Sequence, residues 1–142
     1  MDMDWLAANR QYLVAAVDVV RARLECCAAG LQGQVTVERG FEAQEALEMA
    51  RRRMSVPAAL DVICAKFDLT SFERDLLLLC VGVELDADLA LLCAALQDDS
   101  KRAYPTFALA MKVLPHLQWD ALAPDGALRR WRLIEIGAGS VV

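Results

Sequence analysis

The stretch Leu69–Cys80, LTSFERDLLLLC, places four consecutive leucines directly after a short polar run. Thr70 stands three residues before Glu73, the spacing of a capping box, in which each side chain bonds the main-chain amide of the other residue. The stretch therefore predicts a helix that begins just after Thr70.

This helix is expected to be the central helix of the domain. Its core-facing side is predicted to carry apolar residues at helical spacing, namely Phe72, Leu76, Leu79, Cys80 and Val83. Leu77 and Leu78 fall on other sides, so the helix is apolar almost all round. Such a helix needs several neighbours to bury it.

The charged residues of the motif are predicted to fix helix packing, with no part in catalysis. Glu73 completes the capping box, and Asp75 is expected away from the core-facing side. Arg74 is then free to pair with an acid of a neighbouring helix, either Glu84 or Asp86.

Composition excludes several classes of protein. The 142 residues suit one domain of ordinary size. Hydrophobic residues make up 57%, yet no run reaches the roughly 18 apolar residues of a membrane helix. The start, MDMDW, also lacks the basic and apolar regions of a signal peptide. The apolar excess is therefore expected in a helical core and in surfaces that meet other proteins, with no membrane partner.

Charge and cysteine content narrow the class further. A net charge of −5 makes nucleic acid an unexpected partner, because phosphate binding needs a basic face. The five cysteines show no CxxC spacing and are expected to be free thiols, mostly buried, in a reducing cytoplasm. His116 is the only histidine, so neither a histidine-based triad nor a multi-histidine metal site can form in one chain.

The N-terminal third predicts a helical hairpin. A helix over about 3–29 carries a narrow apolar seam: Leu6, Leu13, Val17, Val20, Leu24 and Cys27. Gly30 and Gly33 are expected to end it, and QVTVERG (34–40) could form a short strand or an extended loop. A second helix over about 41–54 is closed by three arginines at its negative end, so residues 1–55 form the first predicted unit.

Residues 56–142 form the second predicted unit, a compact set of short helices. Ser55 is expected to cap a helix over about 60–67, Asp86 or Asp88 to begin one that ends near residue 96, and Thr106 to cap another that stops before Pro115. ALRRWRLIEI (127–136) is predicted to be a strand. The fold class is thus mainly α, a helical hairpin followed by a winged-helix-like domain that ends in a truncated wing strand.

The cluster Arg129, Arg130, Trp131 and Arg132 is the best candidate for an interaction surface. On a strand, the last two arginines would share one face and Trp131 would project from the other. A DNA-binding winged helix would use such a wing on phosphates, and a DNA-binding regulator is the alternative function. The helix at the position of its recognition helix carries one charge, Lys112, which favours protein contact.

A longer set of motifs resembles the N-terminal winged-helix region of a family of bacterial AAA+ ATPases that often accompany phage-tail-like contractile injection systems. The matching motifs are FERD (72–75), ELD (84–86), QDD (97–99), PTF (105–107) and LRR (128–130). The resemblance covers about residues 57–136, and the helical preface varies among such proteins.

The resemblance implies a non-catalytic domain that recognises a client or assembly component, or positions neighbouring AAA+ subunits in a ring. A homo-oligomer through the N-terminal helix is a further expectation. No G-x-x-x-x-G-K-(S/T) phosphate-binding motif occurs in the chain. No cofactor is therefore expected in this fragment, and ATP and Mg²⁺ would bind an ATPase module encoded beyond Val142.

Overall fold

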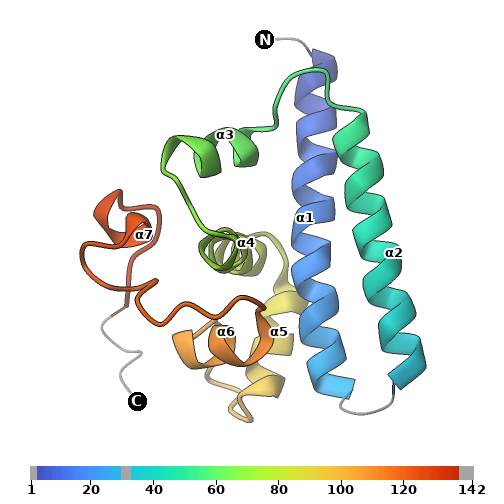
Figure 1. The fold of residues 1–142 in the computed structure, drawn as a ribbon. Coiled ribbons are helices and arrows are strands. Elements are labelled where there is room, and N and C mark those ends of the chain that lie inside the picture. The colour runs from blue at the N-terminus through green and yellow to red at the C-terminus, as the bar shows by residue number, and fades with distance from the viewer. Residues whose placement is uncertain (1–2, 30–32, 138–142) are drawn as a thin grey trace.

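The computed structural model describes residues 3–29 and 33–137, and in these ranges the only regular secondary structure is helical (Figure 1). The helices are α1 (Met3–Ala29), α2 (Gly33–Arg52), α3 (Ala59–Lys66), α4 (Ser71–Leu85), α5 (Ala87–Leu96), α6 (Phe107–Val113) and α7 (Ala127–Arg130). The predicted mainly helical class is confirmed.

The two N-terminal helices form the predicted antiparallel hairpin (Figure 1). The prediction of a strand or loop over 34–40 is wrong, because these residues form the first turns of α2. A strand there would need a neighbouring strand for its main-chain hydrogen bonds, whereas a helix supplies its own. Gly33 begins α2, and Gly30 lies outside the described residues.

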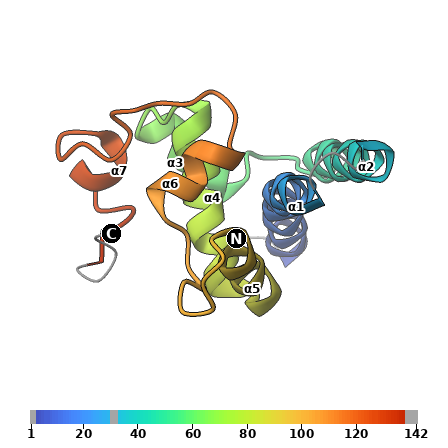
Figure 2. The same ribbon diagram turned by 90° about the horizontal axis from the view of Figure 1, so that it is seen from below.

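Helix α1 lies between α2 and the rest of the molecule (Figure 2). It packs against α2 on one side and against α4 and α5 on the other. Val17, Val20 and Leu24 of the predicted seam are buried, whereas Leu6 near the N-terminal end is 45% exposed. The seam therefore makes its core contacts in the C-terminal part of the helix.

Helix α4 is the central helix, as the leucine run predicts. Leu76, Leu77, Leu78 and Leu79 are all buried. The capping box is present: the Glu73 amide donates to the Thr70 hydroxyl over 3.2 Å, and the Thr70 amide donates to the Glu73 carboxylate over 3.0 Å. Local sequence was enough here, because the capping bonds join residues three positions apart.

Gly82 lies where α4 packs closely against α1 and α5. A Cβ atom on this residue would lie 2.6 Å from Cδ2 of Leu89 and 2.9 Å from Cγ1 of Val17. Both distances are shorter than a van der Waals contact between carbon atoms. The absence of a side chain at residue 82 therefore allows three helices to meet.

The predicted cap of α3 is wrong. Its N-cap residue is Ala58, which has no side-chain oxygen, and Ser55 takes no part. Instead the amide of Ala59 donates to Oδ1 of Asn9 over 2.9 Å. A side chain of α1, fifty residues away in sequence, thus satisfies one of the free amides at this helix start.

The strand predicted over 127–136 is also wrong. Residues 127–130 form α7, and the chain then turns at Arg132, whose φ is 54°. The carbonyl oxygen of Leu128 accepts from the amides of both Leu133 and Ile134, at 2.9 and 3.3 Å. Leu128 is fully buried and anchors this turn, and no described segment lies alongside as a second strand.

The predicted domain boundary near residue 55 stays a prediction. Helix α1 packs against α2 before this boundary and also against helices that follow it. Among the helices described, none has the length and apolar character needed to cross a membrane.

Candidate interaction surface

The arginines of the predicted interaction surface, residues 129–132, have different surroundings in the structure. Nη1 of Arg129 donates to the carbonyl oxygen of Leu122 over 3.0 Å, so this arginine stabilises the preceding loop. The guanidinium of Arg130 lies 5.2 Å from the ring centre of Trp131, a cation–π distance. Trp131 in turn lies 5.5 Å from the ring of Phe67 at the end of α3.

Two cations of the cluster therefore remain on the surface. Arg130 and Arg132 are exposed, whereas Arg129 is partly buried. Because residues 127–130 are helical, the cluster does not have the alternating faces of a strand. The cluster therefore presents two exposed positive charges, fewer than the three arginines in the sequence indicate.

Arg74 of the FERD motif joins a network centred on Tyr12. The hydroxyl of Tyr12 donates to Oδ1 of Asp61 over 2.9 Å, and it accepts from Nη2 of Arg51 over 3.1 Å and from Nη2 of Arg74 over 3.3 Å. One hydroxyl group thus connects α1, α2, α3 and α4. Tyr12 is 1% exposed, and its three hydrogen bonds are partly buried.

The predicted partners of Arg74 are wrong. Its other charged neighbour is Asp75, at 3.7 Å, and not Glu84 or Asp86. Glu84 follows Arg74 by ten residues, which places it about 15 Å further along the same helix, out of reach of the arginine. Asp75, predicted to lie away from the core, is buried and accepts from Nη1 of Arg23 over 2.9 Å.

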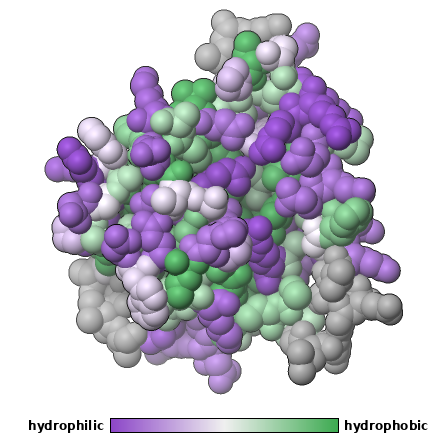
Figure 3. Space-filling model, viewed as in Figure 1, coloured by the Kyte–Doolittle hydropathy of each residue, from purple (hydrophilic) through white to green (hydrophobic). Residues whose placement is uncertain are grey.

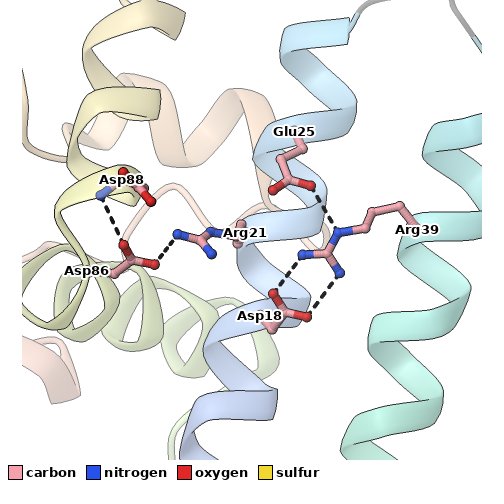
Figure 4. A network of polar contacts seen from close by, with 6 residues as sticks. All are labelled: Asp18, Arg21, Glu25, Arg39, Asp86 and Asp88. Atoms are coloured by element: carbon pink, nitrogen blue, oxygen red, sulfur yellow. Dashed lines mark hydrogen bonds and ion pairs between the residues drawn. The ribbon is translucent and has the colours of Figure 1, made fainter.

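Ion pairs hold α1 to its neighbours on both sides (Figure 4). Asp86 pairs with Arg21 of α1 and also caps α5 by accepting from the amide of Asp88 over 2.9 Å. On the other side, Arg39 of α2 bonds Asp18 through two nitrogens and also bonds Glu25. The hydrogen bond to Asp18 is the largest factor that raises the pKa of Arg39.

Two arginines of the triplet 51–53 at the end of α2 also have structural partners. Arg51 bonds Tyr12, and this bond raises the pKa of the guanidinium. Nη1 of Arg53 donates to Oε1 of Gln11 on α1 over 3.2 Å. These contacts tie the end of α2 to α1, which favours the interpretation of the triplet as a helix end.

Gln97 of the QDD motif closes the loop between α5 and α6. Its Nε2 donates to the carbonyl oxygens of Tyr104 and Arg102 over 2.9 and 3.1 Å. Its Oε1 accepts from the hydroxyl of Thr106 over 2.6 Å. That hydroxyl oxygen also accepts from the amide of Leu109 over 3.2 Å, so Thr106 caps α6 as predicted.

Helix α6, at the position of a recognition helix, presents few groups that could read bases. Leu109 and Ala110 are buried, and the exposed residues of the helix are Ala108 and Lys112. Base recognition requires side chains that donate or accept hydrogen bonds in the groove. The exposed side of α6 offers one such side chain.

An apolar groove lies between α4, residues 104–107 and residues 133–137. Its volume is about 830 Å³, and most of its lining side chains are aliphatic or aromatic. Two carboxylates, Glu84 and Glu135, stand in the lining and are exposed. The groove has a mostly apolar lining, and it is a candidate site for a partner protein.

The groove contains one thiol in addition to its two carboxylates. Its lining includes the thiol of Cys80, whose pKa burial raises to about 11, with Glu84 as a smaller cause. A thiol with this pKa is protonated at neutral pH and is a weak nucleophile. In the described residues no group of three His, Cys, Asp or Glu side chains could hold a metal ion.

Sequence reasoning missed Tyr12, Asn9 and Gln97 as organising residues. Tyr12 carried a usable signal, because a tyrosine beside an apolar helix seam needs a hydrogen-bond partner once it is buried. Asn9 and Gln97 gave no comparable signal, since the partner of Asn9 is the start of α3, fifty residues away, and the main-chain partners of Gln97 lie in a loop whose course depends on the tertiary structure.

Comparison with known proteins defines the class. The family model of the winged helix domain, variant, matches residues 38–140. This match covers most of the chain, so the protein belongs to this winged helix domain family. The winged-helix part of the sequence resemblance is thereby confirmed. Neither the curated proteins nor the solved structures gave a match.

Proposed function

We propose that this winged helix domain is the non-catalytic, protein-binding N-terminal region of an AAA+ ATPase that serves a contractile injection system. In this role it recognises a client or an assembly component, or positions subunits of the ring. The observation that carries the proposal is the apolar groove beside α4, which offers a partner protein buried surface. ATP and Mg²⁺ would bind a separate ATPase module, and the proposed location is the bacterial cytoplasm.

The charge distribution supports a protein partner. The chain has a net charge of −5, and Arg129, Arg51 and Arg53 are engaged in contacts within the domain. The face in Figure 3 shows many hydrophilic residues, with hydrophobic residues in small groups between them. The arginine-rich motifs are therefore explained by contacts within the domain, without a broad basic surface for nucleic acid.

The exposed Arg130 and Arg132 favour a DNA-binding regulator as the second candidate function. The two functions differ in binding to a fluorescein-labelled random 20-base-pair duplex, measured by anisotropy between 50 and 200 mM salt. If two arginines contact phosphates, the log–log slope of affinity against salt is about −1.8. We expect no saturable binding to this duplex.

A matched variant makes the DNA test decisive. The double substitution Arg130→Glu with Arg132→Glu removes both exposed cations of the cluster, whereas Arg10→Glu makes the same change on α1. Salt-dependent binding that the first variant abolishes and the second retains would establish the regulator and refute the protein-binding role.

The ATPase context has its own test. We expect the genomic reading frame to continue beyond Val142 into a G-x-x-x-x-G-K-(S/T) motif, followed by a Walker B carboxylate. A stop codon directly after Val142 would refute the ATPase context and leave the winged helix family unchanged.

A further inference from the structure

We propose that the apolar groove binds an extended, apolar segment of a partner protein that carries a lysine or arginine, with its cation between Glu84 and Glu135. This inference rests on the protein-binding function proposed above and names the chemistry of the partner. It is carried by the charge of the groove, its apolar lining and the main chain of its rim.

The charged side chains that line the groove are all acidic. The described residues that line it include two carboxylates and no lysine, arginine or histidine. Glu84 and Glu135 are exposed, and neither forms an ion pair with a described residue. Asp86, two residues after Glu84, is already paired with Arg21.

Helix α4 adds to the negative potential at this end of the groove. Glu84 lies in its last turn, which contains no basic residue. The C-terminal end of a helix carries a partial negative charge, which stabilises a nearby cation. A partner with a basic side chain would therefore be favoured over an acidic or neutral one.

The apolar lining limits what else the partner can be. The lining includes Leu77 and Val81 of α4, Phe107 of α6, and Ile134 and Ile136 after α7. Ile136 is 48% exposed although it is among the most apolar residues of the chain. Covering such side chains gains about 25 cal/mol per Å² of apolar surface, so the partner must supply aliphatic or aromatic groups.

The rim of the groove favours an extended partner. The amides of Leu133 and Ile134 bond the carbonyl oxygen of Leu128, whereas those of Glu135 and Ile136 form no main-chain hydrogen bond to a described residue. Their side chains suit β-structure, which is why this stretch was predicted to be a strand. An extended segment could bond these free main-chain groups as an added strand does.

The experiment selects ligands from a phage-displayed library of random twelve-residue peptides on the immobilised 142-residue chain. We expect the selected peptides to share alternating apolar residues and at least one lysine or arginine. A synthetic peptide of the consensus sequence, labelled with fluorescein, then gives dissociation constants by anisotropy.

Charge-reversal variants locate the binding site. The double variant Glu84→Lys with Glu135→Lys should weaken binding of the consensus peptide by at least about tenfold, because like charges then face each other. Glu45→Lys makes the same kind of change on the exposed side of α2 and should leave binding unchanged. Ile136→Ser should also weaken binding, and circular dichroism of each variant reports whether the helices are intact.

Three results would overturn the inference. They are an acidic or uncharged consensus, the absence of any selected peptide, and binding that survives the charge reversal. Sedimentation of the chain alone tests another occupant: a dimer dissociated by the double variant would make a second copy the ligand and refute a partner segment. The DNA and reading-frame experiments decide the proposed function separately, so the two failures are distinguishable.

Discussion

The two helices of the N-terminal hairpin are embedded in the molecule to different degrees. Helix α1 packs against α2, α4, α5 and α6, whereas the substantial helix contacts of α2 are with α1 alone (Figure 2). Substitutions in a helix with neighbours on several sides are expected to cost more, because its surroundings cannot close around a lost group. The comparison teaches that α1 belongs to the core, while α2 covers one side of it.

Leucine truncations should give the largest difference between the two helices. Leu24→Ala on α1 removes a side chain with 0% exposure, and we expect a loss of about 2–5 kcal/mol in the free energy of unfolding. Leu47→Ala on α2, where the leucine is 4% exposed, should cost about 2 kcal/mol, since α2 can move toward α1. Urea unfolding measures both, and equal losses would contradict the proposed difference.

Two glycines test the same contrast with opposite signs. Gly82→Ala should destabilise the protein by about 1–3 kcal/mol, because its Cβ would lie 2.6 Å from Leu89 and 2.9 Å from Val17. Gly40→Ala on α2 meets nothing within 4 Å and should stabilise the helix by about 0.5–1 kcal/mol. Thermal melts of both variants check the signs, and a neutral Gly82→Ala would show that the three helices separate easily.

The Tyr12 hydroxyl links the covering helix to the core. Tyr12→Phe leaves Arg51, Asp61 and Arg74 without this common partner, and we expect a loss of about 1–2 kcal/mol. A double-mutant cycle with Arg51→Ala measures the part that passes through α2. A coupling energy near zero would mean that α2 is not stabilised through this hydroxyl.

The smallest effect is expected at the outer ion pair of the hairpin. Arg39→Ala removes the bonds to Asp18 and Glu25, and we expect a loss of about 0.5–1 kcal/mol at low salt. In 1 M salt the loss should shrink, because screening acts on partly exposed charges. Arg10→Ala, an exposed position on α1, serves as the control, and a loss at Arg39 that salt leaves unchanged would contradict an electrostatic origin.

Most of the helices, and little of the candidate site, could be predicted from the sequence. The first helix, the capping box at Thr70 and Glu73, the Asp86 cap and the Thr106 cap are confirmed. Each of these features depends on residues within a few positions of one another. The pattern of apolar residues likewise identified α4 as the central helix.

The errors share a different cause. The segment 34–40 is helical, the segment 127–136 turns around Leu128, and α3 is capped by Asn9 from another helix. The sequence predicts Glu84 or Asp86 as the partner of Arg74, but its neighbours are Asp75 and Tyr12. The first three structures depend on contacts with residues far away in the sequence. The partner of Arg74 depends on distances along and between helices, which a short motif does not give.

By itself, the sequence determined the helical class, the positions of several helix starts and the acidic character of the surface. The helical class and the helix starts follow from hydrogen bonds and side-chain spacing within one or two helical turns, and the acidic character follows from the net charge of −5. Only the tertiary structure decided that Tyr12 joins four helices and that Gly82 permits α4 to approach α1 and α5. It also decided that α4, residues 104–107 and residues 133–137 line an apolar groove with two exposed carboxylates. Such contacts join residues tens of positions apart, and their geometry exists only after the helices have packed.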